Sequence, residues 1–167
     1  MGDKKQLNLT KILFGVYFLI LVWTLLFKLN FSLEELYRSR SINLIPFAGT
    51  ATVNGRIHMA EIINNIIVFV PVGIYACMLK QEWSILNKIS IAFFISLGIE
   101  VLQFVLAIGS TDITDLIGNT LGGVIGIGIF YLFAKFFKNK AIKILNILAS
   151  SATVGLVGLL SILILVN

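Results

Sequence analysis

Long apolar runs separated by short polar connections make up almost the whole chain. Five such runs cover residues 12–29, 62–79, 89–108, 116–133 and 144–166. Each is about as long as a helix that crosses a hydrocarbon core of roughly 30 Å. Gly118, Gly122 and Gly126 recur every four residues in the fourth run, which indicates close helix packing. The pattern predicts an all-α, polytopic membrane protein with five transmembrane helices, in which residues 1–167 form a single domain.

The positive charges between these runs predict the orientation of the chain. The N-terminal segment and the connections at residues 80–88 and 135–143 fall on one side with nine lysines, against four lysines and arginines on the other side. The positive-inside rule therefore places the N-terminus in the cytoplasm and the C-terminus outside. The loop of residues 30–61 and a tight reversal at Gly109–Asp115 then face outward.

Composition agrees with a membrane protein and excludes several kinds of functional site. Hydrophobic residues make up 58% of the chain, charged residues only 13%, and the mean hydropathy is +1.00. A soluble domain has about a quarter charged residues. The net charge of +5 comes from lysines beside apolar runs, which indicates membrane topology and not nucleic-acid binding. Cys77 is the single cysteine and His58 the single histidine, which excludes an internal disulfide and a cysteine-based zinc site and argues against a histidine-based hydrolase.

Acidic and amide side chains within or beside the apolar runs mark the candidate site. A charge near the centre of a bilayer costs about 2.5–3.5 kcal/mol on insertion scales, so it needs a partner, water or a ligand. Glu100 and Gln103 are spaced to share one helix face, as are Glu61 and Asn65. We expect an outward-facing polar cleft that binds the head group of an amphiphile while its lipid chains stay in the bilayer. The predicted ligand-binding residues are Arg38, Arg40, Asn43, Arg56, Glu61, Asn65, Glu100, Gln103, Asp112, Asp115 and Asn119.

The same residues also have a structural interpretation. Asp112, Asp115 and Asn119 share a face of the fourth helix, and Asp112 would cap its N-terminus while Asp115 interacts with the helix dipole. Glu100 would be a neutral carboxyl group that hydrogen-bonds to a neighbouring carboxamide and holds helices together. Asn119 fits either an interhelical contact or a contact to a ligand.

Four blocks of the chain, in order, resemble the signature blocks of the VanZ family and together span Asn43–Gly126. They are Asn43-Leu44-Ile45-Pro46-Phe47, then Glu61-x-x-x-Asn65-x-x-x-Phe69-x-Pro71-x-Gly73, then Glu100-x-x-Gln103, then Asp112-x-x-Asp115-x-x-x-Asn119-x-x-Gly122. The resemblance implies a small multi-pass protein of the bacterial cell membrane that lowers susceptibility to teicoplanin-type lipoglycopeptide antibiotics. Many members carry an arginine at the position of Gly109 and a third acid at that of Thr114, which this chain lacks.

The function we favour from the sequence is non-enzymatic, with no catalytic residue, metal or cofactor. Membrane lipids are the expected partners, with a lipoglycopeptide or a lipid-linked cell-wall precursor as the candidate ligand. One alternative is a divalent-metal-dependent enzyme acting on a phospholipid or cell-wall lipid precursor, with Glu100, Asp112, Asp115 and Asn119 as oxygen ligands. The other is a membrane scaffold in which the polar groups only bind helices together.

Overall fold

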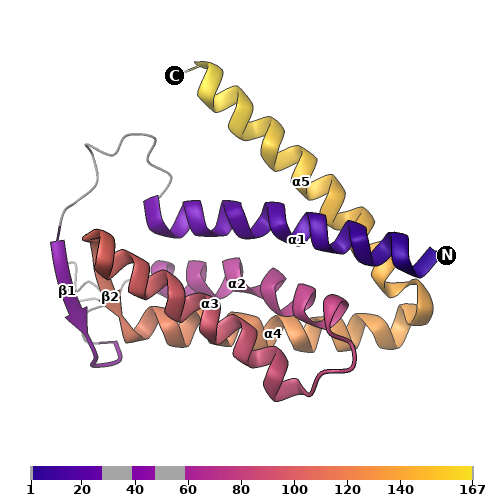
Figure 1. Ribbon diagram of the computed structural model, residues 1–167, viewed down its shortest axis with the longest axis horizontal. Helices are drawn as coiled ribbons and strands as arrows, with labels where there is room; N and C mark the ends of the chain where they lie inside the picture. Colours follow the sequence, from indigo (N-terminus) through magenta and orange to yellow (C-terminus); the bar gives the residue numbers. More distant parts are fainter. Residues whose placement is uncertain (1, 28–38, 48–58, 167) are drawn as a thin grey trace.

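The computed structural model describes residues 2–27, 39–47 and 59–166, and these are mostly helical (Figure 1). The elements in chain order are α1 (Gly2–Phe27), β1 (Ser39–Asn43), α2 (Met59–Leu79), α3 (Ile85–Leu106), β2 (Ile108–Asp112), α4 (Ile113–Phe137), the short 3-10 helix η2 (Lys138–Lys140) and α5 (Ala141–Val166).

Four helical stretches in the described residues are long and apolar enough to cross a membrane. They are Lys4–Leu26, Met59–Leu79, Ile85–Leu106 and Ile113–Leu159. The last stretch combines α4, η2 and most of α5. The mostly helical fold is therefore confirmed, with four helical stretches long and apolar enough to span a membrane, whereas the division into five spans and the orientation stay predictions.

Glycines bring α2 and α4 into close contact along their length. A β-carbon at Gly122 would overlap the carbonyl oxygen of Ile66, and one at Gly126 would overlap the carbonyl oxygen of Val70. A β-carbon at Gly73 on α2 would in turn overlap the backbone of α4. Small residues that allow backbones to touch are typical of helix pairs in membranes. The close-packing interpretation is confirmed for Gly122 and Gly126, whereas a β-carbon at Gly118 would make only ordinary van der Waals contacts.

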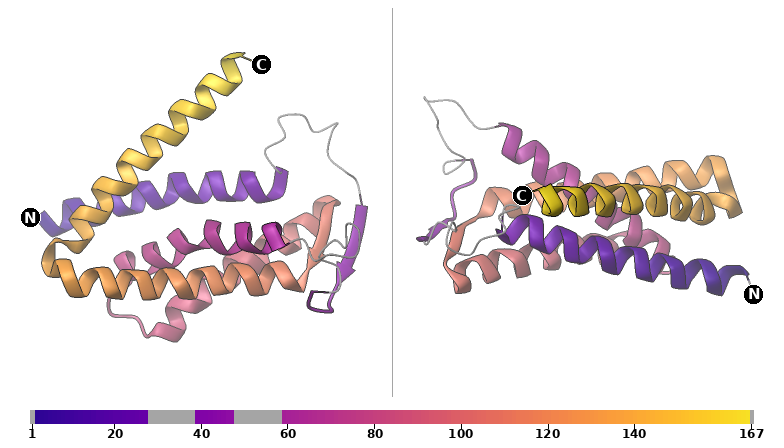
Figure 2. Two further views of the ribbon diagram at one scale, coloured as in Figure 1. Left: turned by 180° about the vertical axis from the view of Figure 1, so that it is seen from behind. Right: turned by 90° about the horizontal axis from the view of Figure 1, so that it is seen from above.

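The two outer helices, α1 and α5, are held together near the N-terminus and separate from there (Figures 1 and 2). Asn146 of α5 is fully buried, accepts a hydrogen bond from the Thr10 hydroxyl at 3.0 Å, and donates to the Gln6 side-chain oxygen at 2.9 Å. Beyond this clamp α5 leaves the bundle, and a largely apolar cavity of about 340 Å³ lies between α1, α2 and α5. No predicted site residue lines this cavity.

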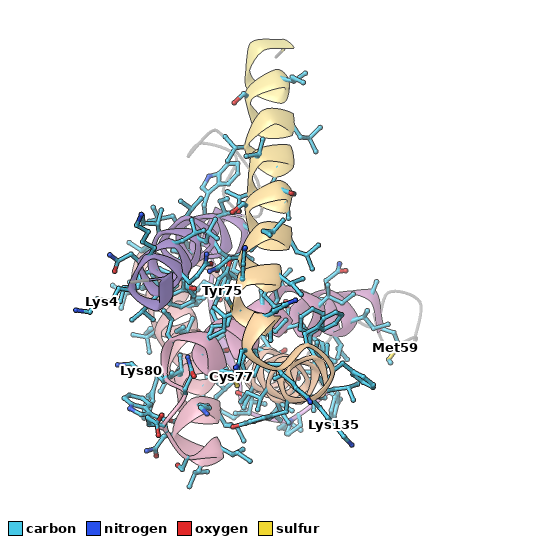
Figure 3. The ribbon with its side chains drawn as sticks, turned by 90° about the vertical axis from the view of Figure 1, so that its right-hand side faces the viewer. Lys4, Met59, Tyr75, Cys77, Lys80 and Lys135 are labelled. Carbon is cyan, nitrogen blue, oxygen red and sulfur yellow. The ribbon has the colours of Figure 1, made fainter. Side chains whose placement is uncertain are left out.

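The two ends of the bundle differ in chemistry. Figure 3 looks onto the end that contains the N-terminus, where Lys4, Lys80 and Lys135 lie around the helix ends. The strands β1 and β2 lie at the opposite end (Figure 1). The lysines thus gather away from the acidic residues that follow α3.

The strands correct two sequence predictions. The all-α prediction is wrong in detail, because β1 and β2 form a parallel two-stranded sheet that pairs Ser39 with Ile108 and Asn43 with Asp112. The tight reversal predicted at Gly109–Asp115 is also wrong, since its first residues are extended in β2. The third helix stops at Leu106 because Ala107 takes the left-handed conformation, with φ of 57°, that commonly ends a helix.

Candidate functional site

Asp112 lies where β2 meets α4 and caps the helix. Its backbone is extended, and its Oδ1 atom accepts a hydrogen bond from the backbone N–H of Thr114 at 2.8 Å. A side-chain acceptor at this position satisfies a backbone donor that has no partner within the helix. Asp115 follows in the first turn, where a negative charge interacts favourably with the helix dipole. The capping interpretation of Asp112 is confirmed, and it leaves the second carboxylate oxygen for other partners.

Asn43 provides the partner for that second oxygen. The β1–β2 register places Asn43 beside Asp112, and Asn43 Nδ2 donates to Asp112 Oδ2 at 3.0 Å. The other end of the same carboxamide, Asn43 Oδ1, accepts the backbone N–H of Ile45 at 3.2 Å. The carboxamide therefore links the turn after β1 to the N-terminus of α4.

Glu100 joins the same group from α3. Its side chain is only 3% exposed, and its Oε2 atom accepts the backbone N–H of Asp112 at 3.0 Å. The Thr111 hydroxyl donates to the Glu100 backbone carbonyl at 3.1 Å. The described donors to the Glu100 and Asp112 carboxylates are thus neutral backbone and amide N–H groups.

Asn65 connects α2 to this region. Its Nδ2 atom donates to Asp115 Oδ1 at 2.7 Å, and Asn65 is buried. Gly118, one turn further along α4, faces the same part of α2, where a β-carbon would make an ordinary van der Waals contact at 3.6 Å with the Asn65 β-carbon. The structure therefore brings together five of the eleven predicted residues, from five elements: Asn43, Asn65, Glu100, Asp112 and Asp115.

Three other predicted residues have different surroundings. Gln103 donates to the carbonyl oxygen of Leu25 at 3.0 Å, so it satisfies an acceptor in the last turn of α1. Asn119 donates to the Ser96 hydroxyl at 2.9 Å in a buried contact between α4 and α3. Glu61 is partly exposed and makes no side-chain hydrogen bond within the described part of the chain.

The arginines cannot be placed around these residues. Arg38 and Arg56 lie outside the described residues, and Arg40 is described only as part of β1, where it pairs in register with Gly109. Their predicted contacts to a ligand stay predictions.

Two buried oxygen atoms are available to accept a hydrogen bond. Gln103 Oε1 and Asn119 Oδ1 have no hydrogen-bond partner among the residues that the structure describes, and the two side chains are 8% and 2% exposed. A buried acceptor without a partner costs about 1–3 kcal/mol, so a water molecule or a ligand donor would stabilise it. The acids, in contrast, do not gather as a metal site: within residues 2–27, 39–47 and 59–166 no three His, Cys, Asp or Glu side chains are placed to share an ion.

Sequence reasoning missed several polar residues that build the region. The Thr114 hydroxyl accepts the backbone N–H of Phe47 at 3.0 Å, and Ser96 receives the Asn119 carboxamide. The Asn146 clamp was also missed, although a carboxamide inside the run of residues 144–166 is the kind of signal that singled out Glu100. Thr114 gives no such signal, because a threonine beside a helix start is common.

Comparison with known proteins gives two matches. A family model described as VanZ/LLP1 matches residues 14–134, a range that contains all eleven predicted site residues. Protein VanZ of Enterococcus faecium is 40% identical over 134 residues, which cover 79% of this chain and 80% of that protein. No solved structure matches the chain.

Proposed function

The chain belongs to the VanZ/LLP1 family, and we propose that it lowers the susceptibility of a bacterial cell to teicoplanin-type lipoglycopeptides. Family membership supports a role in teicoplanin resistance. We further propose that the residues around Asp112 engage the polar head of a lipidated or lipid-linked amphiphile at the outer face of the membrane.

One observation carries the second part of the proposal: separate elements bring acids and amides together at one end of the bundle. Glu100 of α3 and Asn43 of β1 contact Asp112, the N-cap of α4, and Asn65 of α2 contacts Asp115 in the first turn of α4. Holding carboxyl groups among apolar helices is costly, and glycines already allow close packing of α2 against α4. Carboxylate and carboxamide oxygens are suitable acceptors for the peptide N–H and sugar O–H groups of a glycopeptide.

The location of these residues favours ligands that arrive through the membrane. Each buried CH₂ of an acyl anchor contributes about 0.8 kcal/mol to membrane binding, so a lipidated drug accumulates at the bilayer surface. A membrane protein that binds the lipidated drug at the bilayer surface, or that changes the molecules the drug contacts there, protects more against a lipidated drug than against a drug that arrives from solution.

Expression in a susceptible host tests this function. We expect the protein to raise the minimum inhibitory concentration of teicoplanin well above any change for vancomycin, which has no acyl chain. A lipoglycopeptide from which the acyl chain has been removed is the matched control and should behave as vancomycin does. Equal shifts for all three drugs would contradict the proposed mechanism.

The proposal requires the β1–β2 end of the bundle to face outward, with five spans and a cytoplasmic N-terminus. The lysines at the other end support this orientation. In a Cys77→Ser background, Glu82→Cys, between α2 and α3, should be protected from a membrane-impermeant thiol reagent in intact cells. Asn54→Cys, in the sequence-predicted outer loop, should react. The opposite labelling pattern would overturn the orientation.

A further inference from the structure

The turn that follows β1 carries apolar side chains that the other residues described in the structure do not cover. Leu44 is 71% exposed, Ile45 67% and Phe47 49%, and Pro46 between them is also exposed. We call residues 44–47 the apolar turn. A contiguous exposed apolar surface of this kind marks an interaction site.

The apolar turn is fixed in place by polar residues beneath it. Ile45 donates its backbone N–H to Asn43 Oδ1 at 3.2 Å, and Phe47 donates its backbone N–H to the Thr114 hydroxyl at 3.0 Å. Phe47 has a φ of 64°, a conformation that a bulky residue adopts only where its surroundings hold it. These contacts keep the apolar side chains pointed away from the protein.

The backbone of the apolar turn suits a nonpolar environment. The two hydrogen bonds occupy the N–H groups of Ile45 and Phe47, and Pro46 has no N–H. Three of the four residues in positions 44–47 therefore present no free backbone donor. Unpaired backbone donors are costly in lipid but not in water, so this arrangement fits insertion among lipids better than exposure to solvent.

The position of the turn leads to the same partner. β1 runs across the end of the bundle and not along it, and the turn that follows lies at this end, near the start of α4 (Figures 1 and 2). The bond to Thr114 sets the turn at the level of the first residues of α4. On α4 itself, Ile117 and Leu121 are 42% and 45% exposed just below that level. Exposed apolar side chains thus occur both on the first turns of α4 and on the apolar turn bonded to its start.

We propose that residues 44–47 form an interfacial membrane anchor, which inserts its apolar side chains into the head-group and acyl boundary of the adjacent leaflet. The partner is the lipid bilayer itself. Because Asn43 links the turn to Asp112, the anchor also fixes the acidic residues at the level of the lipid head groups. The apolar turn lies outside the acidic site, and its insertion into lipid does not depend on the antibiotic.

Fluorescence quenching in vesicles tests the anchor. In a Cys77→Ser background, the Ile45→Cys variant is labelled with an environment-sensitive dye and reconstituted into phosphatidylglycerol–phosphatidylcholine vesicles. Two controls calibrate the signal: Leu121→Cys for a site on the lipid-facing surface of α4, and Glu82→Cys for a site in the connection between α2 and α3. Leu44→Cys provides a second reporter in the same turn, and both positions are exposed, so labelling should not disturb the fold.

The expected result is quenching by lipids that carry a nitroxide high on the acyl chain, several-fold stronger than quenching by iodide present on both sides of the membrane. The label at position 45 should lie about 5–10 Å deep in the head-group and acyl boundary of the leaflet. Iodide quenching equal to that of the Glu82→Cys label would place the turn in water and overturn the proposal. Protection from both iodide and nitroxide lipids would indicate a protein contact, such as a second copy of the chain, and would overturn it as well.

Discussion

Exchanging the carboxylate of Asp112 with the carboxamide of Asn43 separates two roles of this pair, the hydrogen bonds that hold the elements together and the negative charge at position 112. Asp112 accepts one hydrogen bond from Thr114 and one from Asn43, while Asn43 also accepts the Ile45 N–H. The pair therefore needs one side chain that accepts twice and one that both donates and accepts. Aspartate and asparagine can exchange positions and still make these hydrogen bonds. The exchange moves the negative charge from position 112 to position 43.

The single substitution Asp112→Asn should destabilise the protein. The new carboxamide can still cap α4, because asparagine and aspartate are equally good N-caps. Its NH₂ group, however, then faces the NH₂ group of Asn43, whose own oxygen is already bonded to Ile45. Losing a hydrogen bond to a charged acceptor costs about 1.5–3 kcal/mol. That corresponds to a fall of about 3 to 12 °C in the unfolding midpoint of a chain of this size.

The double variant Asn43→Asp/Asp112→Asn should recover this loss. The carboxamide at position 112 accepts from Thr114 and donates to the carboxylate at position 43, which still accepts from Ile45. All three hydrogen bonds are restored, so we expect a midpoint within about 2 °C of the wild type. Unfolding in detergent is followed with a thiol-reactive dye, because the single cysteine, Cys77, is fully buried in the folded protein.

Teicoplanin resistance measured on the same variants then separates the effect of the hydrogen bonds from the effect of the negative charge at position 112. If the residues act only by holding elements together, the double variant regains resistance together with stability. If the charge of Asp112 contacts a ligand, the double variant is stable but does not protect cells. A double variant no more stable than Asp112→Asn would refute the hydrogen-bond assignment from which both outcomes are derived.

Three further experiments test the packing and the buried polar contacts. Gly122→Ala should destabilise the protein by about 1–3 kcal/mol in thermal unfolding, because its β-carbon meets the α2 backbone, whereas Gly128→Ala has nothing within 4 Å and should be neutral or slightly stabilising; equal effects would contradict the α2–α4 contact. Asn146→Ala should lower stability by about 1–3 kcal/mol through loss of the α1–α5 clamp, and an unchanged midpoint would argue against that clamp. The double variant Asn119→Leu/Ser96→Ala should be nearly neutral for stability, because it removes both partners of a buried hydrogen bond together with an unpaired oxygen. If this variant no longer protects cells from teicoplanin, Asn119 is assigned to ligand binding. If protection is retained, Asn119 is assigned to helix packing.

The sequence predicted the helices well because their signal is local. Apolar runs of membrane-spanning length are visible in any window, and α2 and α4 contain the predicted runs at 62–79 and 116–133. The helix of the first run starts earlier than predicted, at Gly2, because residues such as Lys4 and Lys5 favour a helix although they are too polar for a membrane core.

The strands could not be predicted in the same way. β1 and β2 pair across 69 positions of the chain, and a pairing between distant segments leaves no periodic pattern in either one. The Gly109-Ser110-Thr111 segment contains turn-forming residues, so local chemistry favoured a reversal where the structure has a strand. Because of this sheet, Asp112 lies beside Asn43, a neighbour that helix spacing alone does not reveal.

Helix spacing gave the faces of the polar residues but not their partners. Glu100 and Gln103 were placed on one face, yet Glu100 contacts β2 while Gln103 contacts the end of α1. Two neighbours on one helix face have different partners when two elements, here β2 and α1, pack against that face. The partner of each residue therefore depends on how the helices assemble, which the spacing within one helix does not contain.

The most direct test of the acidic site is the teicoplanin susceptibility of cells that produce Asp115→Asn at the wild-type level in the membrane. This substitution keeps the oxygen that accepts the Asn65 hydrogen bond and removes the negative charge. Glu82→Gln is the matched control, an exposed acid in the connection between α2 and α3. The account predicts that Asp115→Asn reduces the inhibitory concentration of teicoplanin to that of cells without the protein, while Glu82→Gln protects as the wild type does. Full protection by Asp115→Asn would contradict a function for the acidic residues beyond the fold.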